Sequence, residues 1–207
     1  EAVLLLGKVT DTQDITGTVL EEKDVKVTEE AVRETVLSFV GDYMQIPPMY
    51  SALKVNGKKL CDLAREGKTV ERQARPVKIL TIDILDVTLP RVRMRVHCSK
   101  GTYIRTLAED IGEALGCGAH LIGLRRVQTG VFTLKGCITL QELEALPPAQ
   151  RLQALLPVDA LLPSHSPVML DADNAGRFLS GLRRRGDWPD APQVRVYGPP
   201  PVPDGVA

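Results

Sequence analysis

Hydrophobic and polar positions along the chain follow two different periods. Residues 91–98 alternate strictly, with Val, Met and Cys side chains on one face and three arginines and His97 on the other. This alternation predicts a strand of an antiparallel sheet with one face in the core, although an exposed basic face can also bind phosphate. Residues 77–88 are rich in Val, Ile and Leu and precede Leu89-Pro90, so the two segments are predicted to form a hairpin.

Two longer segments show the period of a helix. In residues 29–40 four apolar side chains, the last of them Leu37 and Val40, share one face, and Thr28 can cap the first turn. Residues 103–115 also carry an apolar face, and a glycine follows them as a stop. Both are predicted amphipathic helices.

Shorter elements follow from weaker patterns. The spacing of apolar and turn-forming residues predicts a loop or hairpin over 45–57, strands over 4–10, 119–130 and 168–170, and helices over 58–66, 139–146 and 171–180. The fold class predicted from this order is α+β, a mainly antiparallel mixed sheet flanked by helices.

The character of the chain changes after Pro163. The segment that follows is linker-like, and the tail from Arg183 is rich in Pro and Gly. We therefore expect one domain over 1–163 and the start of a small, incomplete domain over 164–207. The apolar first residues and the ending in mid-pattern predict a chain cut at both ends.

Composition places the chain among globular proteins. Of its 207 residues, 25% are charged and 43% are apolar, and no apolar run reaches the ~20 residues that span a bilayer. The four cysteines stand singly without metal-ligand spacing, which favours buried thiols over a metal site and predicts a cytoplasmic protein.

The net charge of zero hides an uneven distribution. Residues 1–42 contain four Lys/Arg against ten Asp/Glu, whereas residues 43–135 contain sixteen against eight, a net charge of +8. A polyanion would bind the middle of the chain, because Lys and Arg displace the counterions condensed on a phosphate backbone. Ordinary solvated surface charges explain the same count equally well.

Several catalytic schemes have no support in the sequence. Phosphate-cradling G-x-x-x-x-G-K-[ST] and G-x-G-x-x-G motifs are missing from it, as are G-x-S-x-G and H-E-x-x-H. The three histidines are isolated. We expect no cofactor and no metal.

The remaining candidate is the segment K-G-T-Y-I-R-T at residues 100–106, where a strand leads into a helix. Backbone N–H groups at such a junction can hold an anion, and Gly101 lets the chain come close to a ligand. Tyr103 could stack on a nucleobase, and Arg105 could pair bidentately with a carboxylate or phosphate. A tyrosine and an arginine at a helix start are, however, usually structural.

The same segment resembles the active-site motif of the TruB family of tRNA pseudouridine synthases. Four further segments resemble that family in order and spacing: TDTQDITG (10–17), QIPPMYSALKVNGKKL (45–60), LAREG (63–67) and GCGAHLIGLRR (116–126). The resemblance implies a pseudouridine synthase fold over 1–163 and an enzyme that converts uridine to pseudouridine at position 55, in the T-loop of tRNA. It implies no metal and no organic cofactor.

Residue roles follow from this resemblance. Tyr103 corresponds to the tyrosine packed against the target base, Arg105 to the arginine that pairs with the nucleophilic aspartate, and Leu124 to an apolar residue of the pocket. Residues 45–67 correspond to an RNA-gripping insertion. The substrate-binding residues predicted within it are Tyr50, Lys54, Lys58 and Lys59.

One departure from the family limits the prediction. The family's nucleophile lies in a G-x-L-D-P-x-A-T-G-type motif that does not occur in these 207 residues, and Asp11 and Asp14 belong to the TDT-x-D turn. The chain as given is therefore predicted to be inactive, monomeric and bound to the T-arm of tRNA. The alternatives are a non-catalytic RNA-binding or RNA-folding module on this scaffold and a cytosolic scaffold without an RNA partner.

Overall fold

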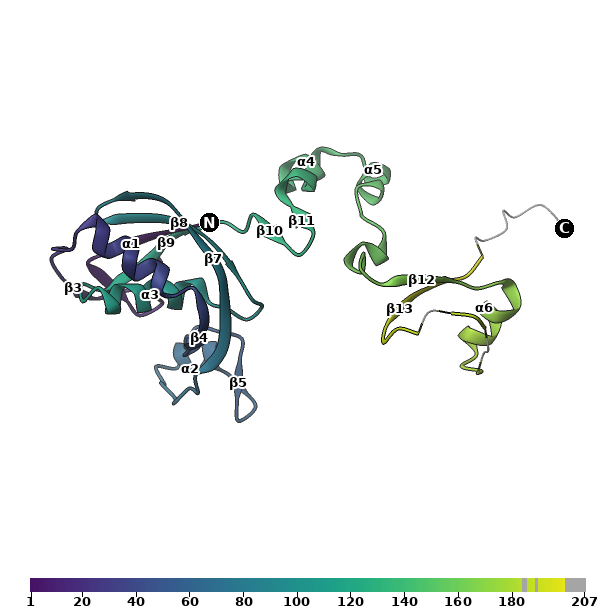
Figure 1. Ribbon diagram of the computed structural model, residues 1–207, viewed down its shortest axis with the longest axis horizontal. Helices are drawn as coiled ribbons and strands as arrows, with labels where there is room; N and C mark the ends of the chain where they lie inside the picture. Colours follow the sequence, from purple (N-terminus) through teal and green to yellow (C-terminus); the bar gives the residue numbers. More distant parts are fainter. Residues whose placement is uncertain (184–185, 189, 200–207) are drawn as a thin grey trace. The chain divides into compact units, whose positions relative to one another are not determined.

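An antiparallel sheet of five strands organises the first part of the chain (Figure 1). The computed structural model describes residues 1–183, 186–188 and 190–199. The chain divides into two compact units, 1–136 and 137–207. The first contains β1 (Ala2–Leu6), β2 (Lys8–Thr10), β3 (Val19–Glu22), α1 (Glu29–Ser38), β4 (Gly41–Gln45), β5 (Lys54–Val55), β6 (Lys58–Lys59), α2 (Leu60–Arg65), β7 (Arg75–Thr88), β8 (Arg91–Cys98), α3 (Ile104–Ala114), β9 (Ala119–Leu124), β10 (Gln128–Thr129), β11 (Phe132–Thr133) and the 3₁₀ turn η1 (Leu134–Gly136).

The sheet has the strand order β4-β7-β8-β1-β9, and every neighbouring pair is antiparallel. The helices α1 and α3 lie together over one face of it (Figure 1). Side chains from both helices and from the covered face of the sheet form one core, in which Leu4, Ile79, Met94, Leu107 and Ile111 are fully buried. The α+β class and the antiparallel sheet predicted from the sequence are therefore confirmed.

The alternation in β8 produces the expected two faces. Val92 and Met94 are buried, while the three arginines and His97 are exposed. Arg95 donates a hydrogen bond to the Glu1 carboxylate at 2.7 Å, and by register Asp83 lies opposite Arg95 on β7. The exposed basic face is thus partly neutralised by neighbouring acids.

Several predicted boundaries shift for local reasons. The helix α1 is capped by Thr28 as predicted but ends at Ser38, and Leu37 and Val40 are exposed. The strand predicted over 4–10 is broken at Gly7 (φ +88°), where an added Cβ would lie 2.7 Å from Val25 Cγ2. The segment 119–130 is a strand only to Leu124. The cysteines are not uniformly buried, since Cys137 is exposed.

The second unit combines a parallel strand pair with short helices. Its elements are α4 (Leu140–Ala145), α5 (Pro148–Gln153), the 3₁₀ helix η2 (Val158–Leu161), β12 (Ser166–Met169), α6 (Ala172–Leu179) and β13 (Val194–Tyr197). The capping box of Thr139 and the cap by Asp171 are present as predicted. The strand β13, which pairs with β12, was not predicted. The division at Gly136 differs from the expected domain boundary at Pro163, which stays a prediction.

Gly112 fixes the distance between α3 and β9. A Cβ added there would lie 2.1 Å from the Ala119 backbone nitrogen and 2.4 Å from the Gly118 carbonyl carbon, so the strand backbone would have to move. We predict that Gly112→Ala lowers the free energy of unfolding of the first unit by about 3 kcal/mol, measured by urea denaturation with circular dichroism.

Gly176 in α6 is the matched control, because an added Cβ there meets no atom within 4 Å. Gly176→Ala should stabilise its own unit by about 0.5–1 kcal/mol through the higher helix propensity of alanine. Unfolding of this unit is measured by the fluorescence of Trp188. Equal stability of Gly112→Ala and the unaltered chain would contradict the prediction.

Candidate functional site

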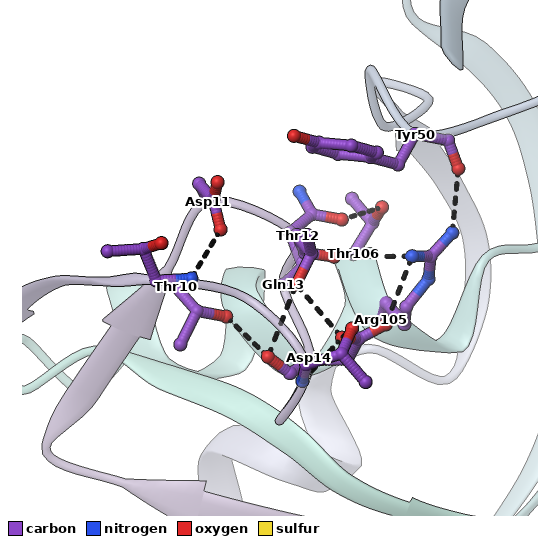
Figure 2. A network of polar contacts seen from close by, with 10 residues as sticks. Thr10, Asp11, Thr12, Gln13, Asp14, Tyr50, Arg105 and Thr106 are labelled. Carbon is purple, nitrogen blue, oxygen red and sulfur yellow. Dashed lines mark hydrogen bonds and ion pairs between the residues drawn. The ribbon is translucent and has the colours of Figure 1, made fainter. Parts of the chain in front are cut away.

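The guanidinium of Arg105 joins three segments that are distant in the sequence. It donates hydrogen bonds to the Tyr50 carbonyl oxygen at 2.8 Å, to the Asp14 carboxylate at 3.1 Å and to the Thr12 carbonyl oxygen at 3.3 Å (Figure 2). The side chains of Arg105 and Asp14 are only 24% and 21% exposed, so this ion pair is partly shielded from water. Arg105 itself lies in the first turn of α3.

The turn at residues 10–14 places both Thr12 and Asp14 beside Arg105. The Asp14 carboxylate accepts hydrogen bonds from the Thr16 hydroxyl at 2.6 Å, from the Thr12 hydroxyl at 2.9 Å and from the Thr16 amide at 3.0 Å. Burial on its own would raise the pKa of Asp14, but the hydrogen bonds from Thr16, Thr12 and Arg105 outweigh it and hold this pKa below its ordinary value. Asp14 is therefore ionised and fully engaged at neutral pH.

Gln13 attaches this turn to α3. Its side-chain oxygen accepts a hydrogen bond from the Thr106 hydroxyl at 2.9 Å, and its amide nitrogen donates to the Glu109 carboxylate. The backbone of the turn is also bonded to β9, since the Leu121 amide donates to the Gln13 carbonyl oxygen at 3.0 Å. Gln13 is 9% exposed and has a left-handed backbone (φ +64°).

Gln45 holds the start of α3 from the other side. Its amide group bonds both backbone groups of Tyr103, accepting from the nitrogen at 2.8 Å and donating to the carbonyl oxygen at 3.0 Å. Tyr103 is the N-cap residue of α3 and its own side chain makes no capping bond. A side chain from the end of β4 thus fixes the backbone of the N-cap residue.

The predicted lysines lie together on a separate hairpin. Lys54 is paired with Lys59 and Val55 with Lys58 across a two-residue turn, Asn56-Gly57, in which both residues have positive φ. This is the backbone that a tight hairpin requires. All three lysines are exposed, whereas Leu60, which begins α2 directly after them, is buried.

A cavity of about 480 Å³ lies between the insertion and α3. Among the described residues its lining includes Tyr50, Gln13, Arg72 and three acids of α3 at positions 109, 110 and 113. Burial and the neighbouring Glu113 carboxylate raise the pKa of Asp110 to about 6, and burial also raises the pKa of Glu109. Neither Tyr103 nor Arg105 is among the residues that line this cavity.

The structure brings together only part of the predicted site. Arg105 contacts the Tyr50 backbone, and Tyr103 lies two residues before Arg105. Figure 2 shows the Tyr50 ring pointing toward the side of Asp11, away from its carbonyl oxygen. Leu124 is 59% exposed at the end of β9, opposite Ala2. The residues that the structure describes contain no group of three or more His, Cys, Asp or Glu suited to a metal ion.

Family profiles match most of the chain. A profile described as "TruB family pseudouridylate synthase (N terminal domain)" matches residues 1–104, and one described as "tRNA pseudouridylate synthase B C-terminal domain" matches residues 105–163. The chain belongs to the TruB family. The family resemblance predicted from the five sequence segments is therefore confirmed.

Known members of the TruB family are similar over nearly the whole chain. The chain is 54% identical to tRNA pseudouridine synthase B of Ralstonia nicotianae over 96% of its own length and 65% of the relative. It is 50% identical to the protein of that name in Burkholderia mallei, over 95% of its length and 68% of the relative. The chain thus spans about two thirds of the length of the relatives it matches.

Solved structures show the same fold as this TruB-family chain. The crystal structure of a Cbf5-Nop10-Gar1 complex superposes with a TM-score of 0.60 at 25% identity, covering 87% of this chain and 47% of that one. The structure of an H/ACA RNP bound to a substrate RNA containing 2'-deoxyuridine gives 0.56 at 23% identity over 87% of this chain and 45% of that one. The pseudouridine synthase fold predicted from the sequence is confirmed.

Sequence patterns did not reveal the polar residues that hold this TruB-family site together. Asp14 was assigned to a turn, and its pairing with Arg105 was not predicted, while Gln13 and Gln45 were not singled out. The motifs alone pointed to the two glutamines. Gln13 occupies the x position of TDT-x-D, and Gln45 is the first residue of the Q-I-P-P-M-Y segment.

Asp110 yields a pH-dependent prediction. Because its pKa in the folded chain, about 6, exceeds the ordinary 3.8, the folded state binds this proton more tightly than the unfolded state. The resulting stabilisation is complete below pH 3.8 and is lost as the pH rises through 6. Asp110→Asn should therefore raise the free energy of unfolding at pH 7.5 by about 1 kcal/mol, a value reduced for partial exposure of the carboxyl, and change it little near pH 4.

Urea denaturation at the two pH values measures this effect. Asp24→Asn is the control, because the Asp24 side chain is 83% exposed. A loss of stability in Asp110→Asn at pH 7.5 would show that the charged carboxyl has a favourable partner in the folded chain.

Proposed function

We propose that this chain is part of a tRNA pseudouridine synthase that isomerises uridine in the T-loop, at position 55. The observation that carries the proposal is the family membership together with an arginine held by three oxygens at the start of α3. The relatives named tRNA pseudouridine synthase B, 50–54% identical to this chain, support the same activity.

In the proposed reaction an ionised aspartate attacks the target nucleotide after it has been extruded from its stack. The bond between the sugar and uracil N1 breaks, the uracil rotates, and a bond between the sugar and uracil C5 forms. The C5 proton is then lost, N1 carries a proton, and the aspartate is released unchanged. Tyr103 packs against the extruded uracil, and Leu124, exposed at the end of β9, contributes apolar surface. Arg105 binds and orients the aspartate. Its Nη1 donates to Thr12 and Asp14 and its Nη2 donates to Tyr50, whereas its Nε–H has no acceptor among the described residues. A further carboxylate can accept from the remaining donors.

Asp14 does not fit the role of this nucleophile. Its carboxylate accepts four hydrogen bonds from Thr12, Thr16 and Arg105, and a saturated, stabilised carboxylate is a poor nucleophile. We therefore propose that the attacking aspartate belongs to the L-D-P-x-A-T-G-type segment of the family, which these 207 residues do not contain. The chain as given is then inactive by itself.

Substrate binding is assigned to the basic part of the chain. We assign the insertion 45–67 to the T-arm of tRNA, with Tyr50, Lys54, Lys58 and Lys59 as contacts. The exposed lysines of the β5–β6 hairpin suit phosphate contacts. We further propose that 164–207 begins a small RNA-binding domain and that the protein acts as a cytoplasmic monomer without metal or cofactor. In the described part of the chain no helix is long and apolar enough to span a bilayer.

The proposal is tested by incubating unmodified tRNA with the 207-residue chain and with tRNA pseudouridine synthase B of Burkholderia mallei as positive control. We expect pseudouridine, separated by chromatography from uridine of the same mass, from the relative only, and binding without turnover from this chain. Product from these 207 residues would place the nucleophile within them. The non-catalytic RNA module predicts no product even when the chain carries the sequence that precedes Glu1 in its own genome.

The β5–β6 hairpin gives a second prediction. Replacing Lys54, Lys58 and Lys59 together by Gln should weaken binding of the T-arm at least about tenfold at 0.1 M salt. It should also reduce the slope of log K against log salt by about 2–3, because each phosphate contact releases counterions. Fluorescence anisotropy over a salt series measures both quantities.

The control variant removes the same charge from the acidic part of the chain. Lys23, Lys26 and Arg33 are at least 43% exposed and pair with local acids on or before α1. Their triple replacement by Gln should leave the salt slope unchanged. Equal slopes for the two triple variants would exclude the hairpin as the specific phosphate contact.

A further inference from the structure

We propose that Gln13 and Glu109 form a positioning pair that fixes the turn at residues 10–14 against α3 and thereby holds Asp14 and the Thr12 carbonyl on Arg105. The proposal rests on the proposed function, in which Arg105 orients the attacking aspartate. It assigns roles to two residues whose side chains are not among the hydrogen-bond partners of the Arg105 guanidinium.

The bonds of Gln13 and those of Arg105 join the same two segments, the turn at residues 10–14 and the first turns of α3. Two of the three oxygens on Arg105 come from Thr12 and Asp14, the residues on either side of Gln13. On the helix, Thr106 follows Arg105 directly and bonds the Gln13 side-chain oxygen. Because Gln13 is fixed by Thr106 and Glu109, the chain before and after it cannot withdraw from Arg105 without breaking these bonds.

Gln13 and Glu109 each occupy a place that is unfavourable for their residue type. Gln13 is nearly buried and has a left-handed backbone, a conformation that is uncommon for residues other than glycine. Glu109 is half-buried, with Glu113 and Arg72 as its charged neighbours, and burial disfavours its ionised form. A carboxylate at this place is explained by the hydrogen bond that it accepts from the Gln13 amide.

The neutral amide also suits the electrostatics of the site. Gln13 directly precedes Asp14 in the chain, and its side chain donates to the Glu109 carboxylate while accepting from Thr106. A carboxylate at position 13 would bring a third negative charge to the same place. This makes an exchange of the two side chains an informative test.

The experiment uses NMR of the 207-residue chain, so its outcome does not depend on turnover. Gln13→Met removes both hydrogen bonds at similar volume. We expect exchange of the Arg105 guanidinium hydrogens to accelerate about tenfold. The pKa of Asp14 should rise, because its hydrogen bond from Arg105 is lost, but stay below its ordinary value as long as the bonds from Thr16 and Thr12 remain. Ile79→Val, a remote core change that shortens a fully buried side chain and lowers stability, is the control and should alter neither reading.

Exchange of the two side chains tests the pairing itself. Gln13→Glu with Glu109 retained opposes two carboxylates and should accelerate the Arg105 hydrogens at least as much as Gln13→Met. The double variant Gln13→Glu/Glu109→Gln restores one donor amide and one acceptor carboxylate, and it should return the exchange rate to within about twofold of the unaltered chain.

Unchanged Arg105 exchange in Gln13→Met, or a double variant no better than Gln13→Glu alone, would overturn the proposal. A failure of the proposed function appears separately, as absence of pseudouridine from the unaltered enzyme that includes the upstream sequence.

Discussion

The arrangement of the site depends on the guanidinium of Arg105 and the three oxygens around it. These oxygens come from the turn at residues 10–14 and from the loop before the β5–β6 hairpin, so a single side chain joins both segments to α3. Two of the acceptors are backbone carbonyls, whose positions follow from the path of the chain. A planar group with five donors in fixed directions can satisfy all three at once, whereas an ammonium group cannot reach them in the same geometry.

The two buried glutamines extend this arrangement along the helix. Gln45 fixes the backbone of Tyr103, Gln13 fixes Thr106, and Arg105 lies between the two points of attachment. The first turn of α3 is therefore held by neighbouring elements instead of by a capping side chain of its own. Because amides are neutral and can both donate and accept, they attach the helix without altering the charge beside Arg105.

Those parts of the fold that rest on a regular period could be predicted from the sequence. The alternation of β8 and the apolar face of α3 gave the sheet and the helix that carry the core. The prediction failed where pairing at a distance decides the structure. The edge strand β4 has the sequence GDYMQ, which shows no clear apolar period, and β13 becomes a strand only by pairing with β12.

The candidate site was predictable only to a smaller extent. Tyr103 and Arg105 were found because their segment begins a helix with an apolar face and resembles a family motif. Gln13, Gln45 and the pairing of Asp14 with Arg105 left no comparable signal, because a buried polar residue fits no hydrophobic period and its partners lie 58 to 96 positions away. Such contacts are a property of the assembled fold.

The charge balance around Arg105 limits what this residue can do in the proposed reaction. Asp14 is ionised and lies 3.1 Å from the guanidinium, so one negative charge already offsets the positive one. A second carboxylate arriving at Arg105 gains hydrogen bonds from the remaining donors but also meets the field of Asp14. The pKa of that second carboxylate is therefore lowered less than an unpaired arginine would lower it. Arg105 therefore contributes chiefly by fixing the direction of the attacking oxygen. It can do so only if its own guanidinium is held rigidly by the three oxygens around it.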